Sequence, residues 1–223
     1  MSLATYAAIR SAILDWSWQQ GGLTDTIIKD DIFPQLWAMI YYGDRTNGMQ
    51  PVEPLRIRAM QASATLTPSA AGAVTISSAV DANWLEFIEI KPTLTGALPL
   101  KIVEPWEFRQ AQNLWLSGAA PAELATVEGD SLIVSPPQAG TIVAAWYEKF
   151  TALSADGSTD WLVLNAPHVY LRGGLMLACD YTQDERRVQF RDEFAGAIAA
   201  LNLNDRRQRA SGSPQIARPR VVV

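Results

Sequence analysis

The region that most constrains the fold lies between Asn165 and Val223, where two helix signals precede a segment without acidic residues. Asn165-Ala166-Pro167 predicts a helix start, because proline fits the first helical turn, where backbone amides lack partners. Thr182-Gln183-Asp184-Glu185 has the spacing of a capping box and predicts that a second helix begins there. That helix carries an apolar stripe at steps of four, four and three, formed by Phe190, Phe194, Ile198 and Leu201, and its charged residues, Arg191 among them, lie at other angles. We therefore expect an antiparallel helical hairpin over residues 160–205.

The segment 206–223 differs in composition from everything before it. All 23 acidic residues lie at or before Asp205 together with 13 of the 18 basic residues, so this body carries a net charge of −10. The segment itself holds five arginines and no acid: Arg206, Arg207, Arg209, Arg218 and Arg220. It has too few apolar residues to form a core, so we predict an extended basic tail whose arginines bind a partner. The tail can fold back on its own acidic body, or another chain can hold it.

The 223 residues, 48% of them hydrophobic, suffice for one core or for one core with an inserted lobe. Residues 1–50 have helical periodicity, with a first helix from Leu3 to about Trp18 and a second segment, capped by Thr24 or Asp25, that reaches Tyr42. Pro34 requires a kink or a fresh start within the second segment. We expect Trp16, Trp37 and Trp146 in the core, and the single Cys179 there as well.

Residues 51–150 contain short extended runs separated by turn residues, which predicts an antiparallel β lobe. Pro68-Ser69-Ala70-Ala71-Gly72 predicts a hairpin between strands at 64–67 and 74–77, and Glu128-Gly129-Asp130 predicts a tight turn. A short helix is expected near 105–116. The strand 141–147 is apolar on both faces, so we expect it to be central and covered by helices. The fold class is therefore α+β, with the N- and C-terminal helices packed as a bundle around an inserted β lobe.

Catalytic and metal-binding patterns are missing from the sequence. The single His168 has no neighbour that resembles a catalytic triad, and one Cys with one His cannot form a thiolate or imidazole cluster. No phosphate loop or nucleophile elbow occurs. The chain is therefore not expected to be an enzyme or to carry a cofactor, and no secretory signal is evident. Sequence-specific DNA binding is disfavoured, because an acidic body repels phosphates, although such a body suits a wall past which DNA slides.

Several segments together resemble the head-to-tail adaptor (connector) proteins of tailed bacteriophages. The matching motifs span nearly the whole chain: Ile40-Tyr41-Tyr42-Gly43-Asp44-Arg45, Pro54-Leu55-Arg56-Ile57-Arg58-Ala59-Met60, Glu128-Gly129-Asp130-Ser131-Leu132, Asn165-Ala166-Pro167-His168-Val169-Tyr170-Leu171, Asp184-Glu185-Arg186, Ala200-Leu201-Asn202, Asp205-Arg206-Arg207 and Ser211-Gly212-Ser213-Pro214. Their order and spacing match as well. His168 replaces an acidic residue and Arg172 a tyrosine of such proteins, and neither change disturbs the predicted helix.

The resemblance implies a virion component of the neck that forms a dodecameric ring, docks under the portal protein, contacts tail tube or nozzle proteins and surrounds the passing genomic DNA. A stopper or tail-completion protein is the alternative within the virion. A DNA-binding regulator, from a different class, would need a basic face that this body does not show.

Overall fold

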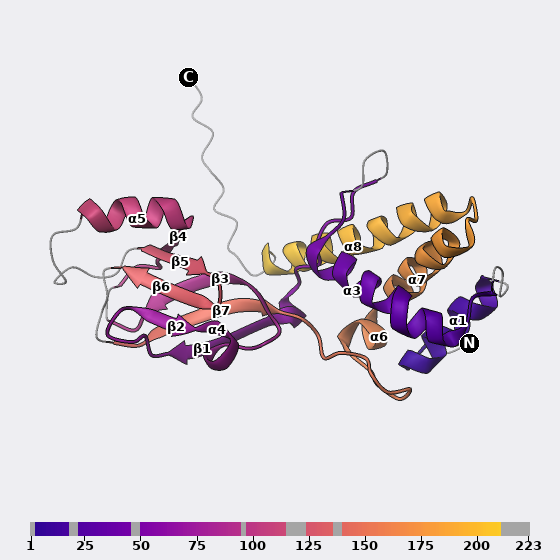
Figure 1. Ribbon diagram of the computed structural model, residues 1–223, viewed down its shortest axis with the longest axis horizontal. Coiled ribbons are helices and arrows are strands. Elements are labelled where there is room, and N and C mark those ends of the chain that lie inside the picture. Colours follow the sequence, from indigo (N-terminus) through magenta and orange to yellow (C-terminus); the bar gives the residue numbers. More distant parts are fainter. Residues whose placement is uncertain are drawn as a thin grey trace, which may run out of the picture. The chain divides into compact units, whose positions relative to one another are not determined.

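The computed structural model describes residues 3–17, 22–45, 50–94, 97–114, 124–135 and 140–210. It is a mixed helix and sheet structure, which confirms the α+β class (Figure 1). The chain divides into two compact units. Unit 1 combines Met1–Ala59 with Thr151–Val223 and contains helices from both chain ends, whereas unit 2 is Met60–Phe150 and contains the strands. Within the described ranges, no helix has both the length and the apolar character that crossing a membrane requires.

The helices of unit 1 share one core. In chain order they are α1 (Tyr6–Trp16), α2 (Asp25–Ile27), the π-helix η2 (Ile28–Ile32), α3 (Phe33–Tyr42), α6 (Trp161–Asn165), α7 (Pro167–Thr182) and α8 (Arg187–Ala210). Helix α7 packs against α1, α3 and α8 (Figure 1). The N- and C-terminal parts of the chain therefore fold as one unit.

The second helical segment begins and breaks where the sequence predicts. Thr24 Oγ1 accepts the Ile27 N–H at its start. In η2 the turn is widened, because the Phe33 N–H bonds to the Ile28 carbonyl, and α3 then begins with Pro34 in its first turn. Proline has no N–H and its ring collides with the carbonyl four residues earlier, so the wider turn accommodates it.

Two adjacent glycines let the neighbours of α7 approach it closely. A Cβ on Gly173 would lie 2.3 Å from Leu36 Cδ1 and 3.0 Å from the Phe194 ring, and a Cβ on Gly174 would lie 2.3 Å from Ile13 Cδ1. These separations are shorter than van der Waals contact. Helices α3, α8 and α1 therefore pack at distances that only a residue without a side chain permits.

The predicted capping box at Thr182 is wrong. Helix α7 continues through Thr182, whose hydroxyl donates to a carbonyl of its own preceding turn, and Gln183 ends the helix in the left-handed conformation (φ 58°). The Asp184 carboxylate then accepts the Arg186 N–H at 2.9 Å, and α8 begins at Arg187. A threonine hydroxyl can bond to a carbonyl of its own helix or cap the next helix. Here Gln183, in the left-handed conformation, ends α7 after Thr182, so the hydroxyl bonds within α7.

Two side chains of unit 1 do not lie where their sequence positions indicate. Arg191, placed off the apolar stripe, is only 5% exposed, because its guanidinium bonds to Asp44 at 2.7 Å and to the Gln50 carbonyl at 3.0 Å. Trp16, expected in the core, is 47% exposed at the end of α1, where the Arg172 guanidinium lies 5.7 Å from its ring centroid. Helical periodicity predicts the face on which a residue lies, but it does not predict which residues of other segments contact that face.

Unit 2 contains two sheets. Its strands are β1 (Gln61–Leu66), β2 (Ala73–Thr75), β3 (Trp84–Pro92), β4 (Lys101–Ile102), β5 (Leu124–Glu128), β6 (Ser131–Ser135) and β7 (Ile142–Glu148). The strand orders are β1-β7-β3 and β2-β6-β5-β4. The pair β4 and β5 is parallel, unlike the other named pairs, so the expectation of a purely antiparallel lobe is wrong. The short helices of this unit are α4 (Ile76–Ala79) and α5 (Pro105–Leu114), and the 3₁₀ turn η3 (Arg58–Met60) precedes β1.

The hairpin expected across residues 68–72 does not exist. Strand β1 pairs with β7, with Ala64 opposite Ala144, whereas β2 pairs with β6, with Val74 opposite Leu132. The turn therefore carries the chain from one sheet to the other. Alternating residues and turn signals indicate that two strands are present, but the partner of each strand is chosen by the core that the strands can bury together.

The core of unit 2 lies between the two sheets, where residues from both are buried: Leu66, Val74, Ile76, Ile90, Leu100, Ala125, Leu132, Val134, Ile142, Ala144 and Trp146. Strand β7 is the middle strand of its sheet, and Trp146 is buried, as predicted. On the other face of β7, however, Val143 is 42% exposed. One face of the central strand is thus covered by the second sheet rather than by helices.

Local turn and helix signals in unit 2 are confirmed more often than strand partners. Gly129 joins β5 to β6 with φ 57°, a left-handed conformation that favours glycine. The neighbouring Asp130 accepts the Ser77 N–H at 2.9 Å, which makes residues 76–79 a helical turn instead of the predicted strand end. Helix α5 begins at Pro105 as predicted, and Trp115, at its expected end, lies outside the described residues.

Candidate partner-binding surface

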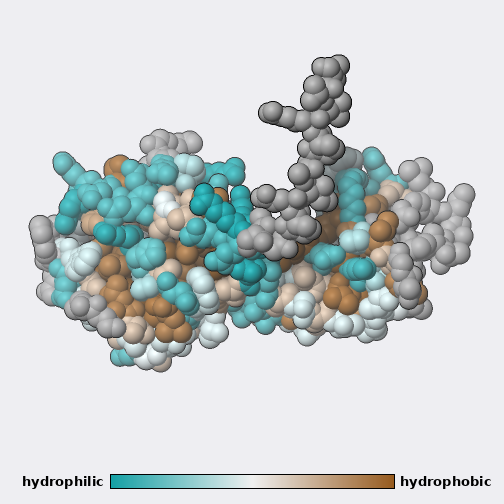
Figure 2. All heavy atoms as spheres, turned by 180° about the vertical axis from the view of Figure 1, so that it is seen from behind, coloured by the Kyte–Doolittle hydropathy of each residue, from teal (hydrophilic) through white to brown (hydrophobic). Residues whose placement is uncertain are grey.

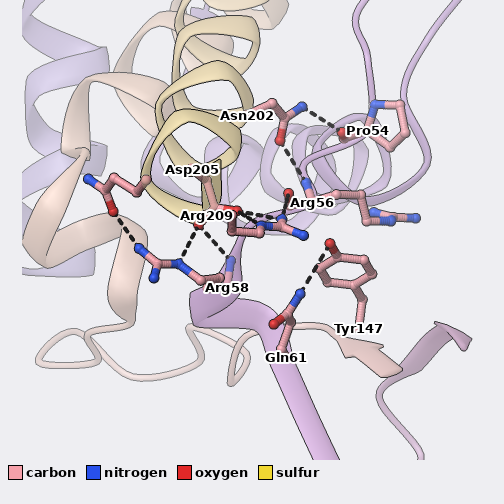
Figure 3. Close-up of polar contacts among 9 residues, drawn as sticks. Pro54, Arg56, Arg58, Gln61, Tyr147, Asn202, Asp205 and Arg209 are labelled. Carbon is pink, nitrogen blue, oxygen red and sulfur yellow. Dashed lines mark hydrogen bonds and ion pairs between the residues drawn. The ribbon is translucent and has the colours of Figure 1, made fainter. Parts of the chain in front are cut away.

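Side chains on one face of α8 bond to the extended segment that precedes η3 (Figure 3). Asn202 accepts the Arg56 N–H at 2.8 Å and donates to the Pro54 carbonyl at 3.0 Å. Asp205, one turn later, accepts both the backbone N–H and the Nε–H of Arg58 at 3.1 Å. A spacing of three residues puts the two side chains on one helix face. Together they hold the extended segment and Arg58, the first residue of η3, along the helix.

Asp205 is the centre of this network. Arg209 donates its Nε–H to the second carboxylate oxygen at 2.7 Å, and Arg58 also reaches Gln208 at 2.5 Å. Burial raises the pKa of Asp205, but the Arg58 N–H and the Arg209 and Arg58 side chains more than offset this, and the pKa lies below its ordinary value. Asp205 is therefore ionised near neutral pH and neutralises part of two guanidinium charges.

Five arginines gather at this end of α8: Arg56, Arg58, Arg206, Arg207 and Arg209. Their guanidinium groups outnumber the single carboxylate of the network, Asp205. Arg206 and Arg207 are exposed, and neither forms an ion pair with a described residue. Figure 2 shows a hydrophilic surface in the area where the described chain ends. We call this group the arginine cluster.

The structure divides the five predicted tail arginines. Arg206, Arg207 and Arg209 lie in α8, so the expectation that the extended tail begins at residue 206 is wrong. Arginine, glutamine and alanine are good helix formers, and Arg209 pairs with Asp205 one turn earlier, which extends the helix to Ala210. Arg209 is thus bound within its own chain. Arg218 and Arg220 lie outside the described residues.

Arg56 and Arg58 were not among the predicted partner-binding residues. The available signal was the motif at residues 54–60, which resembles adaptor proteins, as does the one at residues 200–207. The structure brings these two motifs together through the bonds around Asn202 and Asp205. Residues so far apart along the chain cannot be paired from the sequence of a single protein.

The segment before the network is fixed at its other end by Gly43 and Asp44. Asp44 and Val52 exchange two backbone hydrogen bonds of 2.9 and 2.8 Å. Gly43 has φ 74°, and a Cβ there would lie 2.6 Å from the Val52 carbonyl oxygen. The Asp44 carboxylate also forms the ion pair with Arg191 of α8. Helix α8 is therefore tied to this segment at two separate places.

A groove of about 480 Å³ lies beside the network in unit 1. Its lining residues are Ile57, Arg58, Ala59, Trp161, Leu201, Asn204, Asp205 and Gln208. The larger apolar side chains come from Ile57, Trp161 and Leu201. The groove thus combines an apolar part with a polar part that contains Arg58, and it suits an apolar side chain that carries acidic neighbours.

Three other titratable side chains, His168, Cys179 and Asp160, differ in their surroundings. His168 is exposed, and burial raises the pKa of the Cys179 thiol. Asp160 caps α6 by accepting the Val163 N–H at 2.7 Å and also accepts the Tyr170 hydroxyl. Burial raises the pKa of Asp160 in spite of these bonds. In the described part of the chain, no three His, Cys, Asp or Glu side chains group so that they could hold a metal ion.

Comparison with known proteins gives one family. A comparison with curated proteins finds no match. The family model described as SU10 adaptor protein matches residues 4–219, which is nearly the whole chain and includes both units. The chain therefore belongs to the SU10 adaptor protein family of phage head-to-tail adaptors.

Proposed function

We propose that the protein is a structural component of the virion neck, a head-to-tail adaptor that forms a ring below the portal and joins it to the tail. The observation that carries the proposal is the arginine cluster on an otherwise acidic chain of the adaptor family. A twelve-copy ring is the arrangement that the resemblance implies. The role requires a positioned protein surface and no reaction, cofactor or metal.

The arginine cluster supplies the contact with a neighbouring protein. Arg206 and Arg207 are exposed near the end of a long helix that is bonded to its own chain through Asn202 and Asp205, so their backbone positions are fixed before a partner arrives. A pre-positioned arginine pairs with a carboxylate at lower entropic cost than an arginine on a free chain. Arg218 and Arg220 add to the same attraction. The partner surface is therefore acidic, on the portal protein or on a neighbouring copy.

The acidic body suits a channel through which genomic DNA moves. Residues up to Asp205 carry a net charge of −10, and phosphate contacts with basic side chains dominate the non-specific affinity of proteins for DNA. A wall of like charge keeps DNA in solution at the channel centre. We therefore propose that the ring surrounds the DNA without binding its sequence, and that tail tube, nozzle or other tail proteins contact the ring on its distal side.

The deciding experiment mixes the purified protein with the portal protein of the same phage and images the complex by electron microscopy. A collar of adaptor copies on the portal is the expected result. A collar that appears only after another adaptor has been added indicates a stopper or tail-completion protein instead. Retention on DNA at physiological salt, without collar formation, indicates a DNA-binding regulator and contradicts the proposal.

Two double variants, each lacking two positive charges, test the arginine cluster itself. Arg206→Gln with Arg207→Gln removes two exposed positive charges, and Lys29→Gln with Arg45→Gln removes two exposed charges elsewhere in unit 1. We expect the first variant to bind the portal about tenfold more weakly, which corresponds to about 1.4 kcal/mol, and to melt like the wild type. The second variant should bind like the wild type. Equal weakening by both variants would show that only net charge matters.

A further inference from the structure

An exposed tryptophan at the start of α5 has the features of a binding anchor. Trp106 is 63% exposed. It lies between Glu104, which is exposed, and Glu107, which pairs with Lys101 at 2.8 Å. Tryptophan is enriched among the residues that dominate binding energy in protein interfaces. An exposed indole with acidic neighbours therefore matches a partner that offers an apolar depression beside positive charge.

The groove beside Asp205 has that complementary character. Its volume of about 480 Å³ falls in the range of about 300–1,000 Å³ that is usual for pockets that enclose a small organic molecule. Ile57, Trp161 and Leu201 provide apolar contact for an aromatic ring. Arg58, half exposed, lines the groove, and Arg209 bonds to Asp205, which also lines it. The groove thus favours an aromatic side chain that is flanked by carboxylates.

The chain's own C-terminal residues are a poorer occupant. Residues 211–223 contain two arginines and no acid, so the arginine cluster repels them. The remainder of the chain is acidic, and it presents an exposed tryptophan between two glutamates in the other unit. Charge complementarity therefore favours a second copy as the source of the occupant.

We propose that Trp106 of one copy, together with Glu104 and Glu107, forms a knob that inserts into the groove of a second copy, with the two glutamates facing Arg58 and its neighbouring arginines. The two surfaces differ, so the contact is heterologous and each copy keeps one free knob and one free groove. Repetition of such a contact builds a ring if the rotation closes. This inference rests on the proposed function, because it names the contact that would join neighbouring copies of the adaptor ring.

Cysteine cross-linking of the full-length chain tests this contact. The variant carries Glu104→Cys at the knob and Asn204→Cys, an exposed position on the groove, and is treated with a short bismaleimide alone and together with the portal protein. The native Cys179 is buried and should not react. A ladder of covalent oligomers is expected, and addition of Trp106→Ala should reduce the ladder at least tenfold. A control variant with Leu98→Cys and Asn204→Cys uses another exposed position of unit 2 and should give no ladder.

The outcomes separate the inference from the proposed function. A ladder that depends on Trp106 supports the inference even if no collar forms on the portal, in which case the proposed function fails alone. A collar without any ladder overturns the inference and leaves the proposed function intact. Equal ladders from the knob and control variants, or a ladder that Trp106→Ala does not change, also overturn the inference.

As a second check, Asn204→Glu should weaken the assembly of copies that keep Glu104 at least tenfold, because it places a carboxylate where Glu104 must approach. Glu104→Lys in the partner copy should restore assembly. Ala199→Glu adds the same charge at an exposed position of α8 that does not line the groove, and it should have no effect. Failure of the charge reversal to restore assembly contradicts the proposed pairing.

Discussion

Replacing Asp205 by alanine tests whether α8 fixes the start of η3 at Arg58. The substitution removes the acceptor of the Arg58 N–H and of two guanidinium groups, at distances of 3.1, 3.1 and 2.7 Å. The carboxylate side chain is 10% exposed, so water does not take its place without rearrangement. Asp192→Ala is the matched control, because Asp192 is an exposed aspartate of the same helix.

The magnitude follows from the exposure of each partner. Arg58 and Arg209 are 49% and 36% exposed, so solvent screens their ion pairs and each contributes about 0.5 kcal/mol. The bond from the Arg58 N–H to a charged acceptor contributes about 1.5–3 kcal/mol. Alanine is a better helix former than aspartate and offsets about 0.5 kcal/mol of the loss. We expect Asp205→Ala to lower the free energy of unfolding by about 2–3.5 kcal/mol.

The assay is urea unfolding of both variants, combined with hydrogen exchange of the Arg58 amide by NMR. Asp192→Ala should change the free energy of unfolding by less than about 0.5 kcal/mol and leave the Arg58 exchange rate unchanged. The reasoning is refuted if Asp205→Ala destabilises no more than Asp192→Ala, or if Arg58 exchanges equally slowly in both variants.

The pH dependence gives an independent check on the same residue. The pKa of Asp205 is lower in the folded protein than its ordinary value. Its stabilising contribution is therefore complete above the unfolded pKa of about 3.9 and is lost as the pH falls through the folded pKa. The difference in unfolding free energy between wild type and Asp205→Ala should shrink as the pH is lowered below about 4. A difference that stays constant would show that the carboxylate charge is not involved.

Two further predictions concern the core of unit 1. Gly173→Ala should destabilise the protein by about 1–2 kcal/mol, because its Cβ would meet a neighbouring side chain at 2.3 Å, whereas Gly196→Ala, with nothing within 4 Å, should stabilise it by about 0.5–1 kcal/mol; thermal melts of both variants that shift in the same direction would contradict this. Burial raises the pKa of Asp160, so its contribution to stability is present below the unfolded pKa and is lost as the pH rises through the folded pKa. The stability of the wild type relative to Asp160→Asn should therefore decline from about pH 4 upwards in urea titrations, and an increase would refute the assigned direction.

Local signals in the sequence identified the elements that depend on neighbouring residues. Pro34 predicted the break within the second helical segment, Gly129 the turn between β5 and β6, and Pro105 the start of α5. Each of these depends on the φ angle or the missing N–H of a single residue, so it does not need the rest of the chain. The apolar stripe of α8 was likewise predicted from the sequence, because helical periodicity is a local property.

Strand partners and polar networks needed the tertiary structure. The sequence predicted the approximate positions of β1 and β2. The turn between them, however, does not indicate that each strand joins a different sheet. Asp205 and Arg58 are separated by 147 residues, and Asp44 and Arg191 by the same number. Only the folded chain shows that these charges meet.

The sequence by itself therefore determined the α+β class, most helix positions, the acidic body with its basic C-terminal residues, and the resemblance to phage adaptors. The tertiary structure decided that three of the five candidate arginines are helical, that Arg209 is bound within its own chain, and that Arg56 and Arg58 join them. The physical reason is the range of the forces involved. Backbone preferences act within a few residues, whereas burial and ion pairing act between residues that only folding brings together.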